Sequence, residues 1–263
     1  MKPKPSNLVQ TIERASKILD LVSKSSQGVS IRDLSDELKL PKGTVHRLLL
    51  SLAYFGYIKQ DIKTKKYLLG LKLLELGNLI INQLDLRKLA EPLLKELVES
   101  TRETVHMVII DNNEVVYIDK IETEQSTGGL KMSSMVGARN PAHCSAVGKV
   151  LLSYYLDEEI DNFVKEKGLP PKTLRTITDP LQLKEQLITI KNQGYAIDDE
   201  ENEAGIRCVA APIFNDKGKA ISAISLSGPA FRVTKKLIQD SLKKEIIKTA
   251  SEISKRLGFK TSD

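Results

Sequence analysis

The chain has no tryptophan, only two cysteines and three histidines, and aromatic residues make up 5% of its 263 residues. Cys144 and Cys208 are too few for a disulfide framework, which is typical of proteins in a reducing cytoplasm. No apolar run approaches the roughly 18 residues of a membrane-spanning helix, and no secretory leader pattern is present. We therefore expect a cytoplasmic protein with no membrane partner.

Motifs that mark several enzyme classes are also missing. The sequence contains no Walker loop, no GxGxxG and no HExxH, and none of His46, His106 and His143 stands at metal-ligand spacing from another. We expect no cofactor, no metal site and no catalytic residue. One enzyme alternative stays open, a thiol-dependent hydrolase that uses Cys208 and His143, although a cysteine in an apolar strand is more often a packing residue.

Residues 28–70 carry the pattern of a winged helix-turn-helix. Ser30 can cap a short helix over residues 31–38, with Asp33 completing a capping box. The residue before Pro41 avoids the helical conformation, so the first helix ends there, and Pro41 itself suits the first turn of a second helix. The apolar face of this second helix holds Val45, Leu48, Leu49 and Leu52. A supporting helix is predicted over residues 8–25, with Ile12, Ala15, Ile18, Leu19 and Val22 on its apolar face.

Two short apolar-rich strands, predicted at 57–60 and 67–69, flank the basic loop 61–66. A tight turn between two helices, followed by such a hairpin, is the order that a major-groove reading helix with a phosphate-binding wing requires. The alternative to a DNA-binding motif is an ordinary packed α/β segment whose charged face is simply exposed to solvent.

Charge is distributed unevenly along the chain. Residues 1–75 hold 14 Lys and Arg against 7 Asp and Glu, whereas residues 76–263 hold 26 against 27. This asymmetry indicates a nucleic-acid face on the first domain. The predicted DNA-binding residues are Ser30, Arg32, Lys42, Thr44, His46, Arg47, Lys63, Lys65 and Lys66.

Within this set the wing lysines are expected to contact phosphates. Arg47 can make a bidentate contact to guanine or lie on a phosphate, and both interpretations stay open. An architectural DNA-binding protein without a ligand is a further alternative.

Residues 71–89 are rich in leucine on more than one side. A helix that is apolar beyond one stripe buries a second face, either inside its own domain or against a partner helix. A partner helix would make this segment the dimer element, with two reading helices roughly 34 Å apart on a palindromic operator. We therefore predict a DNA-binding domain over 1–70, a linker or dimerisation helix over 71–89, and a second domain over 90–263.

The second domain mixes helices with strands joined by short turns, which predicts an α+β fold with a mainly antiparallel sheet. Strands are expected near residues 104–110, 115–121, 130–136, 207–214 and 220–227. Helices are expected near residues 92–100, after Pro141, and at 157–167, 180–193 and 234–257. The acidic run 198–201 is expected to be a solvated loop, apart from Asp198.

Two segments of this domain can carry chemistry. Residues 137–149 lead into a helix start, where free amides favour a carboxylate or a phosphate. Ser225 and Ser227 alternate with apolar residues, so both hydroxyls share one face of a strand.

Together with the helix-turn-helix, the stretches PAHCSAVGKVLL, GIRCVAAPIF and ISLSGP, the last followed by Arg232, resemble the IclR family of bacterial transcriptional regulators over nearly the whole chain. The resemblance implies an N-terminal winged helix-turn-helix, a linker helix and a C-terminal effector-binding domain of GAF-like fold. It also implies a homodimer or a dimer of dimers that binds double-stranded DNA and a small organic acid, with repression as the expected direction.

The family's pocket pattern is carried over onto Met132, Ala146, Val147, Asp198, Cys208, Ser225 and Ser227. In this resemblance the amides of Ala146 and Val147 hold a carboxylate. The two serines donate hydrogen bonds to the ligand, and Asp198 accepts one from a ligand hydroxyl.

Two positions depart from the pattern and change the expected shape of the ligand. Val147 is bulkier than the small residue that some members carry, and Gly129 lacks an apolar side chain seen in others. Three classes of ligand therefore stay open: a sugar acid such as 2-keto-3-deoxygluconate, a pyruvate- or glyoxylate-like acid, and an aromatic acid.

Overall fold

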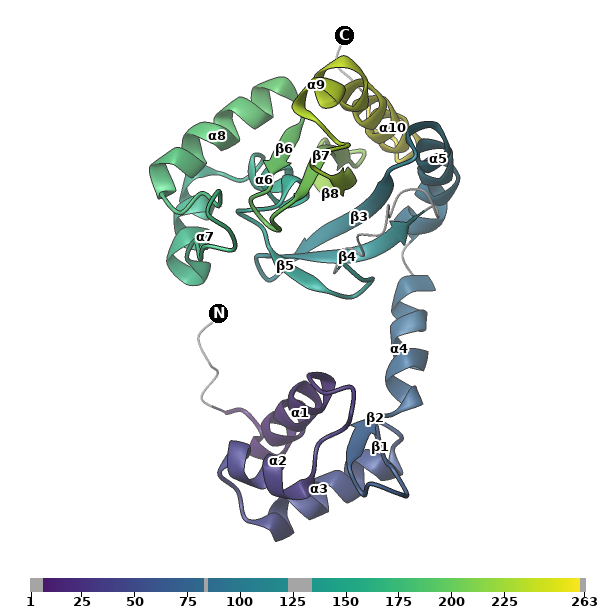
Figure 1. Ribbon diagram of the computed structural model, residues 1–263, viewed down its shortest axis with the longest axis vertical. Helices are drawn as coiled ribbons and strands as arrows, with labels where there is room; N and C mark the ends of the chain where they lie inside the picture. Colours follow the sequence, from purple (N-terminus) through teal and green to yellow (C-terminus); the bar gives the residue numbers. More distant parts are fainter. Residues whose placement is uncertain (1–6, 83–84, 123–133, 261–263) are drawn as a thin grey trace. The chain divides into compact units, whose positions relative to one another are not determined.

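The computed structural model describes residues 7–82, 85–122 and 134–260 (Figure 1). The chain divides into two compact units, residues 1–84 and 85–263. The predicted linker 71–89 spans this division, and its bounds stay a prediction.

The first unit contains the helix-turn-helix. Its elements are α1 Gln10–Ser23, α2 Ile31–Leu38, α3 Lys42–Tyr54, β1 Ile58–Gln60, β2 Tyr67–Leu69 and α4 Leu71–Asn82. The predicted capping box of α2 is present, because the Asp33 amide donates to Ser30 Oγ at 3.2 Å and the Ser30 amide donates to Asp33 Oδ2 at 3.3 Å. The core consists of Ile18, Val22, Leu34, Val45, Leu49, Leu52, Ile58 and Tyr67.

The prediction that Ile12 faces this core is wrong, since Ile12 is 68% exposed. The buried residues of α1 are Ile18 and Val22. The helix therefore packs through its C-terminal half, and its first turn lies beyond the core.

The second unit is built on one antiparallel sheet. Its elements are α5 Asp85–Thr101, β3 Thr104–Asp111, β4 Glu114–Ile121, β5 Arg139–Pro141, α6 Ala146–Leu152, α7 Asp157–Lys167, α8 Pro180–Gln193, β6 Ala196–Asp199, β7 Ile206–Phe214, β8 Ala220–Pro229, α9 Lys235–Leu237, a π-helical turn Ile238–Leu242 and α10 Lys243–Arg256. The strand order is β5-β4-β3-β8-β7-β6. α6, α7 and α8 lie on one face and α5 and α10 on the other (Figure 1). The predicted α+β fold is confirmed.

Strand pairing assembles polar residues on the face covered by α6. Cys208 pairs with Asp198 on one side and with Ser227 on the other, and Ser225 pairs with His106. Because side chains alternate along a strand, these residues share one face, whereas Leu226 belongs to the opposite one.

Several predicted elements are wrong in their bounds. Residues 134–136 form no strand, and the strand that pairs with β4 is β5, because the chain first turns at Gly137 (φ 85°). Residues 130–133 lie outside the described residues. The helix predicted from Pro92 is the longer α5, with the proline inside it, since residues on both sides of Pro92 are buried. The predicted terminal helix is interrupted by the π-helical turn.

The acidic run is not a solvated loop. Asp198 and Asp199 belong to β6, and Glu201 is 5% exposed and paired with Lys149. Asp199 accepts from Arg207 Nε at 2.7 Å. The prediction failed because strand pairing brings Arg207 of β7 against Asp199, and packing brings the distant Lys149 against Glu201.

Gly148 lies where α6 touches the preceding loop, and an added Cβ would come within 2.2 Å of the Ala142 carbonyl oxygen. We expect Gly148→Ala to lower the free energy of unfolding by about 1–3 kcal/mol, the typical cost of overpacking. Gly77→Ala is the control, because nothing lies within 4 Å of that added Cβ. It should raise the free energy of unfolding by roughly 1 kcal/mol, since alanine is favoured over glycine inside a helix. Chemical denaturation measures both, and equal effects would contradict the close approach at α6.

Candidate functional site

The first candidate site is the exposed side of α3. Lys42, His46 and Arg47 are exposed, Thr44 is half-buried, and the buried residues Val45 and Leu49 anchor the helix on its other side. The structure thus leaves the predicted reading residues of α3 accessible on a helix that is fixed by its core.

Ser30 and Arg32 lie at the start of α2. The Ser30 hydroxyl is engaged locally, because it donates to Asp33 Oδ2 at 2.7 Å. Arg32 is exposed, and its Nε lies 3.8 Å from Asp36 Oδ2. Ser30 therefore fixes the start of α2, which is a structural role besides its predicted contact to DNA.

The wing has an ordered turn. Asp61 Oδ1 accepts from the amides of Lys63 at 3.0 Å and Thr64 at 2.7 Å. Gln60 Nε2 donates to the Lys65 carbonyl at 2.9 Å, and Lys65 has φ 58°. These bonds hold Lys63 and Lys65 exposed and Lys66 half-buried on a short hairpin, as a phosphate-binding wing requires.

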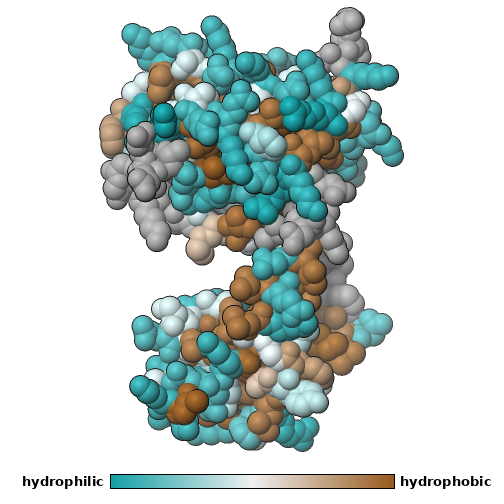
Figure 2. Space-filling model, turned by 90° about the vertical axis from the view of Figure 1, so that its right-hand side faces the viewer, coloured by the Kyte–Doolittle hydropathy of each residue, from teal (hydrophilic) through white to brown (hydrophobic). Residues whose placement is uncertain are grey.

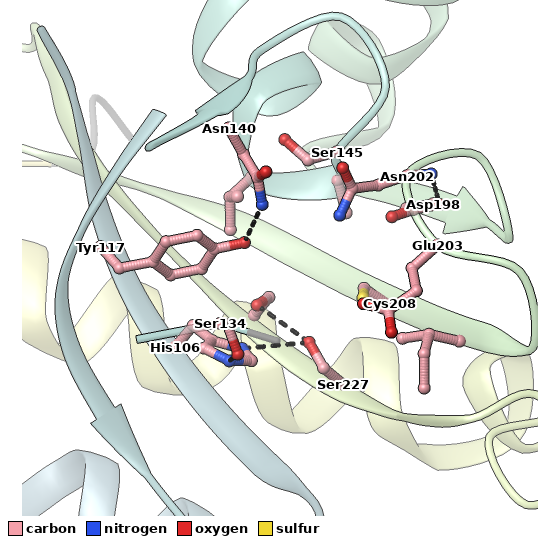
Figure 3. A pocket seen from close by; sticks show the side chains of 14 residues that line it. His106, Tyr117, Ser134, Asn140, Ser145, Asp198, Asn202, Glu203, Cys208 and Ser227 are labelled. Atoms are coloured by element: carbon pink, nitrogen blue, oxygen red, sulfur yellow. Dashed lines mark hydrogen bonds between the residues drawn. The ribbon is translucent and has the colours of Figure 1, made fainter. Parts of the chain in front are cut away.

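The second candidate site is a pocket of the second unit, on the sheet face beside α6 (Figure 3). Its empty volume is about 440 Å³, including the open solvent at its mouth. It is lined by His106, Tyr117, Ser134, Asn140, Ser145, Ala146, Val147, Asp198, Asn202, Glu203, Ile206, Cys208, Ser225 and Ser227. Six of the seven predicted effector-binding residues are among them. Met132, like Gly129, lies outside the described residues.

A chain of hydrogen bonds runs along the floor of the pocket. Ser225 Oγ lies 3.3 Å from Ser227 Oγ, which lies 3.2 Å from His106 Nδ1, and His106 Nε2 lies 2.8 Å from Ser134 Oγ (Figure 3). Burial, together with a smaller effect of the Lys120 charge, lowers the pKa of His106 to about 3. The imidazole is therefore neutral, and each of its nitrogens faces a hydroxyl.

Tyr117 supplies a second polar group. Its hydroxyl accepts from Asn140 Nδ2 at 3.0 Å, and burial raises its pKa to about 12. The phenol is neutral and keeps its proton for donation.

Asp198 is the most deeply buried carboxyl group of the pocket, at 2% exposure. Its Oδ1 accepts from the amides of Glu201 at 2.7 Å and Asn202 at 3.3 Å, and its other oxygen points into the pocket (Figure 3). Burial raises the pKa of Asp198 to about 7, although Lys149 opposes this shift. The side chain can accept a hydrogen bond from a ligand or, when protonated, donate one.

The start of α6 adds backbone donors to the wall. Amides in the first turn of a helix have no partner inside the helix. The Ser145 side chain accepts from the Gly148 amide at 3.2 Å, which leaves the amides of Ala146 and Val147 for another acceptor.

No Lys or Arg lines the pocket in the part of the chain that the structure describes. The described lining offers hydroxyls, amides, carboxyl groups and an imidazole, which suit a small polar molecule. His106, Tyr117 and Asn140 were missed by sequence reasoning. Alternation along residues 104–111 could have placed His106 on the face of Val108, and Asn140 belongs to the segment 137–149 before the helix start, but nothing local marks Tyr117.

The thiol and the histidine of the enzyme alternative lack the electrostatics of a reactive pair. Burial raises the pKa of Cys208, so its thiol stays protonated. His143 Nε2 lies 3.1 Å from the Pro170 carbonyl oxygen, and burial lowers the pKa of this imidazole. A thiolate nucleophile with a histidine base requires the opposite shift of the thiol.

Within residues 7–82, 85–122 and 134–260, no helix is both long and apolar enough to cross a membrane. Those same residues include no cluster of three His, Cys, Asp or Glu side chains that could hold a metal ion.

Comparison with known proteins finds the same family for both units of the chain. The family model for the IclR helix-turn-helix domain matches residues 11–61, and the model for the C-terminal part of the bacterial transcriptional regulator IclR matches residues 78–255. Two relatives come from Escherichia coli strain K12. The HTH-type transcriptional regulator XynR is 35% identical over 96% of this chain and 98% of its own length, and the transcriptional repressor IclR is 32% identical over 95% and 90%.

A solved structure shares the fold. It is an IclR homologue from Microbacterium hydrocarbonoxydans in complex with 4-hydroxybenzoate, 23% identical, with a TM-score of 0.77 over 94% of this chain and 99% of that one. The protein belongs to the IclR family of bacterial transcriptional regulators, which bind DNA through their helix-turn-helix.

Proposed function

We propose that this regulator is a cytoplasmic repressor that binds a palindromic operator as a dimer or a dimer of dimers. A small organic acid in the pocket of the second unit changes its affinity for DNA, and the protein has no enzymatic activity. The observation that carries this proposal is a pocket lined by polar groups in the same chain as an exposed, basic reading helix. A ligand that prefers one state of such a protein changes DNA affinity by a coupling free energy of about 1–3 kcal/mol.

The donors of the pocket support an acid as the ligand. The amides of Ala146 and Val147 suit a carboxylate, while the Ser225 and Ser227 hydroxyls and Asp198 suit further oxygen atoms of a small molecule. The candidates are a sugar acid such as 2-keto-3-deoxygluconate, a pyruvate- or glyoxylate-like acid and an aromatic acid. The relative of the same fold that holds 4-hydroxybenzoate is the reason to keep aromatic acids among them.

The dimer proposal rests on α4. Leu71, Leu74, Leu79 and Ile80 are 77%, 60%, 51% and 63% exposed, and apolar surface runs along this helix (Figure 2). Exposed apolar side chains at these positions favour a second copy of the helix as their cover.

The effector is tested by thermal unfolding of the full chain with pyruvate, glyoxylate, 2-keto-3-deoxygluconate and 4-hydroxybenzoate. A bound acid at about 100 times its Kd adds about 2.7 kcal/mol of stability. We expect one acid to raise the melting temperature and Ser227→Ala to abolish the shift. Ser222→Ala is the matched control, because this buried serine bonds to the Val108 carbonyl outside the pocket. A shift that survives in Ser227→Ala would place the acid elsewhere.

DNA reading is tested with two variants on a set of operator sequences. Arg47→Ala should lower the free energy of DNA binding by about 1–3 kcal/mol and relax specificity at one base pair, because a bidentate contact discriminates between bases. Lys65→Ala should weaken binding to every sequence alike and flatten the salt dependence. Equal losses on all sequences from Arg47→Ala would reduce that residue to a phosphate contact.

The role of α4 is tested by placing a charge among its exposed apolar residues. Ile80→Glu should dissociate the dimer at micromolar concentration, as measured by analytical ultracentrifugation, because a buried carboxylate opposes association. Asn78→Glu introduces the same charge at an exposed position on the opposite side of the helix and should leave the assembly intact. An Ile80→Glu protein that sediments like the wild type would assign the interface to another surface.

A further inference from the structure

A buried charged pair lies behind the pocket wall. The Lys149 side chain is 0% exposed, and its ammonium is paired with Glu201 Oε1, whose side chain is 7% exposed. Neither residue lines the pocket. Lys149 lies on α6, two residues after the pocket residue Val147, and Glu201 lies in the turn that follows β6.

Glu201 connects this pair to Asp198. Its amide donates to Asp198 Oδ1 at 2.7 Å, and its carbonyl accepts from Thr176 Oγ1 at 2.6 Å. Thr173 Oγ1 holds the adjoining Glu200 carbonyl at 2.7 Å. The turn is therefore held by several hydrogen bonds, and the buried Lys149 ammonium contacts Glu201 while its charge also acts on Asp198.

We propose that Lys149 and Glu201 are positioning residues that set the charge of Asp198 in the pocket. An ionised Asp198 offers an acceptor to a ligand hydroxyl, whereas a protonated Asp198 offers a donor to a carbonyl or carboxylate oxygen. The pair behind the wall thus selects between hydroxy acids and keto acids at this point of the pocket. The selection of a ligand rests on the proposed function, but the control of the charge does not.

Four other titratable groups around Asp198 are neutral near pH 7. Burial raises the pKa of Tyr117 and of Cys144 to about 12 and also raises that of Cys208, while that of His106 is lowered to about 3. Glu203 is a further carboxyl group of the pocket wall, carried by the same turn.

The charges of the pair act on Asp198 in opposite directions. Burial has the largest effect and raises the pKa of Asp198, Lys149 lowers it, and the Glu201 carboxylate raises it. The balance places the pKa at about 7, so both forms of Asp198 are populated at neutral pH. Removing the Lys149 charge should therefore raise the pKa of Asp198, and removing the Glu201 charge should lower it.

The experiment is a pH titration by ¹³C NMR of the full chain without ligand, labelled at the Asp side-chain carboxyl carbon. Asp198→Asn assigns the signal. We expect a midpoint near 7 in the wild type, a midpoint at least half a unit higher in Lys149→Met, and one at least half a unit lower in Glu201→Gln. A structural role alone predicts something else, because loosening the turn would let water in and move both variants down, toward the ordinary aspartate value of about 3.9.

Glu103→Gln is the matched control. It makes the same chemical change in another buried ion pair, since Arg232 contacts both Glu103 oxygens at 2.7 Å, and it should leave the Asp198 midpoint in place. Should Lys149→Met fail to fold, Glu201→Gln keeps the proposal testable, because a midpoint that stays or rises in that variant overturns it. If no acid binds but the midpoints move as expected, only the proposed effector function fails.

Discussion

The pairing of β6, β7, β8 and β3 is the constraint on which the pocket depends. Cys208 of β7 stands between Asp198 of β6 and Ser227 of β8, so the polar row crosses three strands in one register. A slip of one residue would turn each of these side chains to the opposite face, where Ile224 and Leu226 are fully buried. Apolar packing on that face thus holds the polar residues on the other.

A buried polar surface of this kind is stable only if its groups are partnered. The floor of the pocket meets this need with its own chain of hydroxyls and the His106 imidazole, and the wall meets it with backbone amides that bind Asp198. Burial lowers the pKa of His106 and raises that of Asp198, which in each case favours the neutral form. The pocket therefore presents neutral or half-titrated groups to a ligand.

The DNA-reading unit depends on different physics. Its reading and wing residues lie on the surface, where few long-range contacts shape them, and local bonds fix the segments that carry them. The Ser30–Asp33 capping box starts α2, and Asp61 orders the wing by binding two amides that follow it within three residues. Such contacts join residues close in the sequence, which is why this unit can be read from the order of its residues.

The sequence by itself determined what depends on near neighbours: the helix over 31–38, the alternation that puts Ser225 and Ser227 on one face, and the concentration of positive charge in residues 1–75. Only the tertiary structure decided which distant residues meet. It brought His106 and Tyr117 into the pocket, buried Glu201 against Lys149 across 52 positions, and left Ile12 exposed. Burial and pairing across such separations depend on the whole packed arrangement, because the dielectric surroundings of a group are made by every element around it.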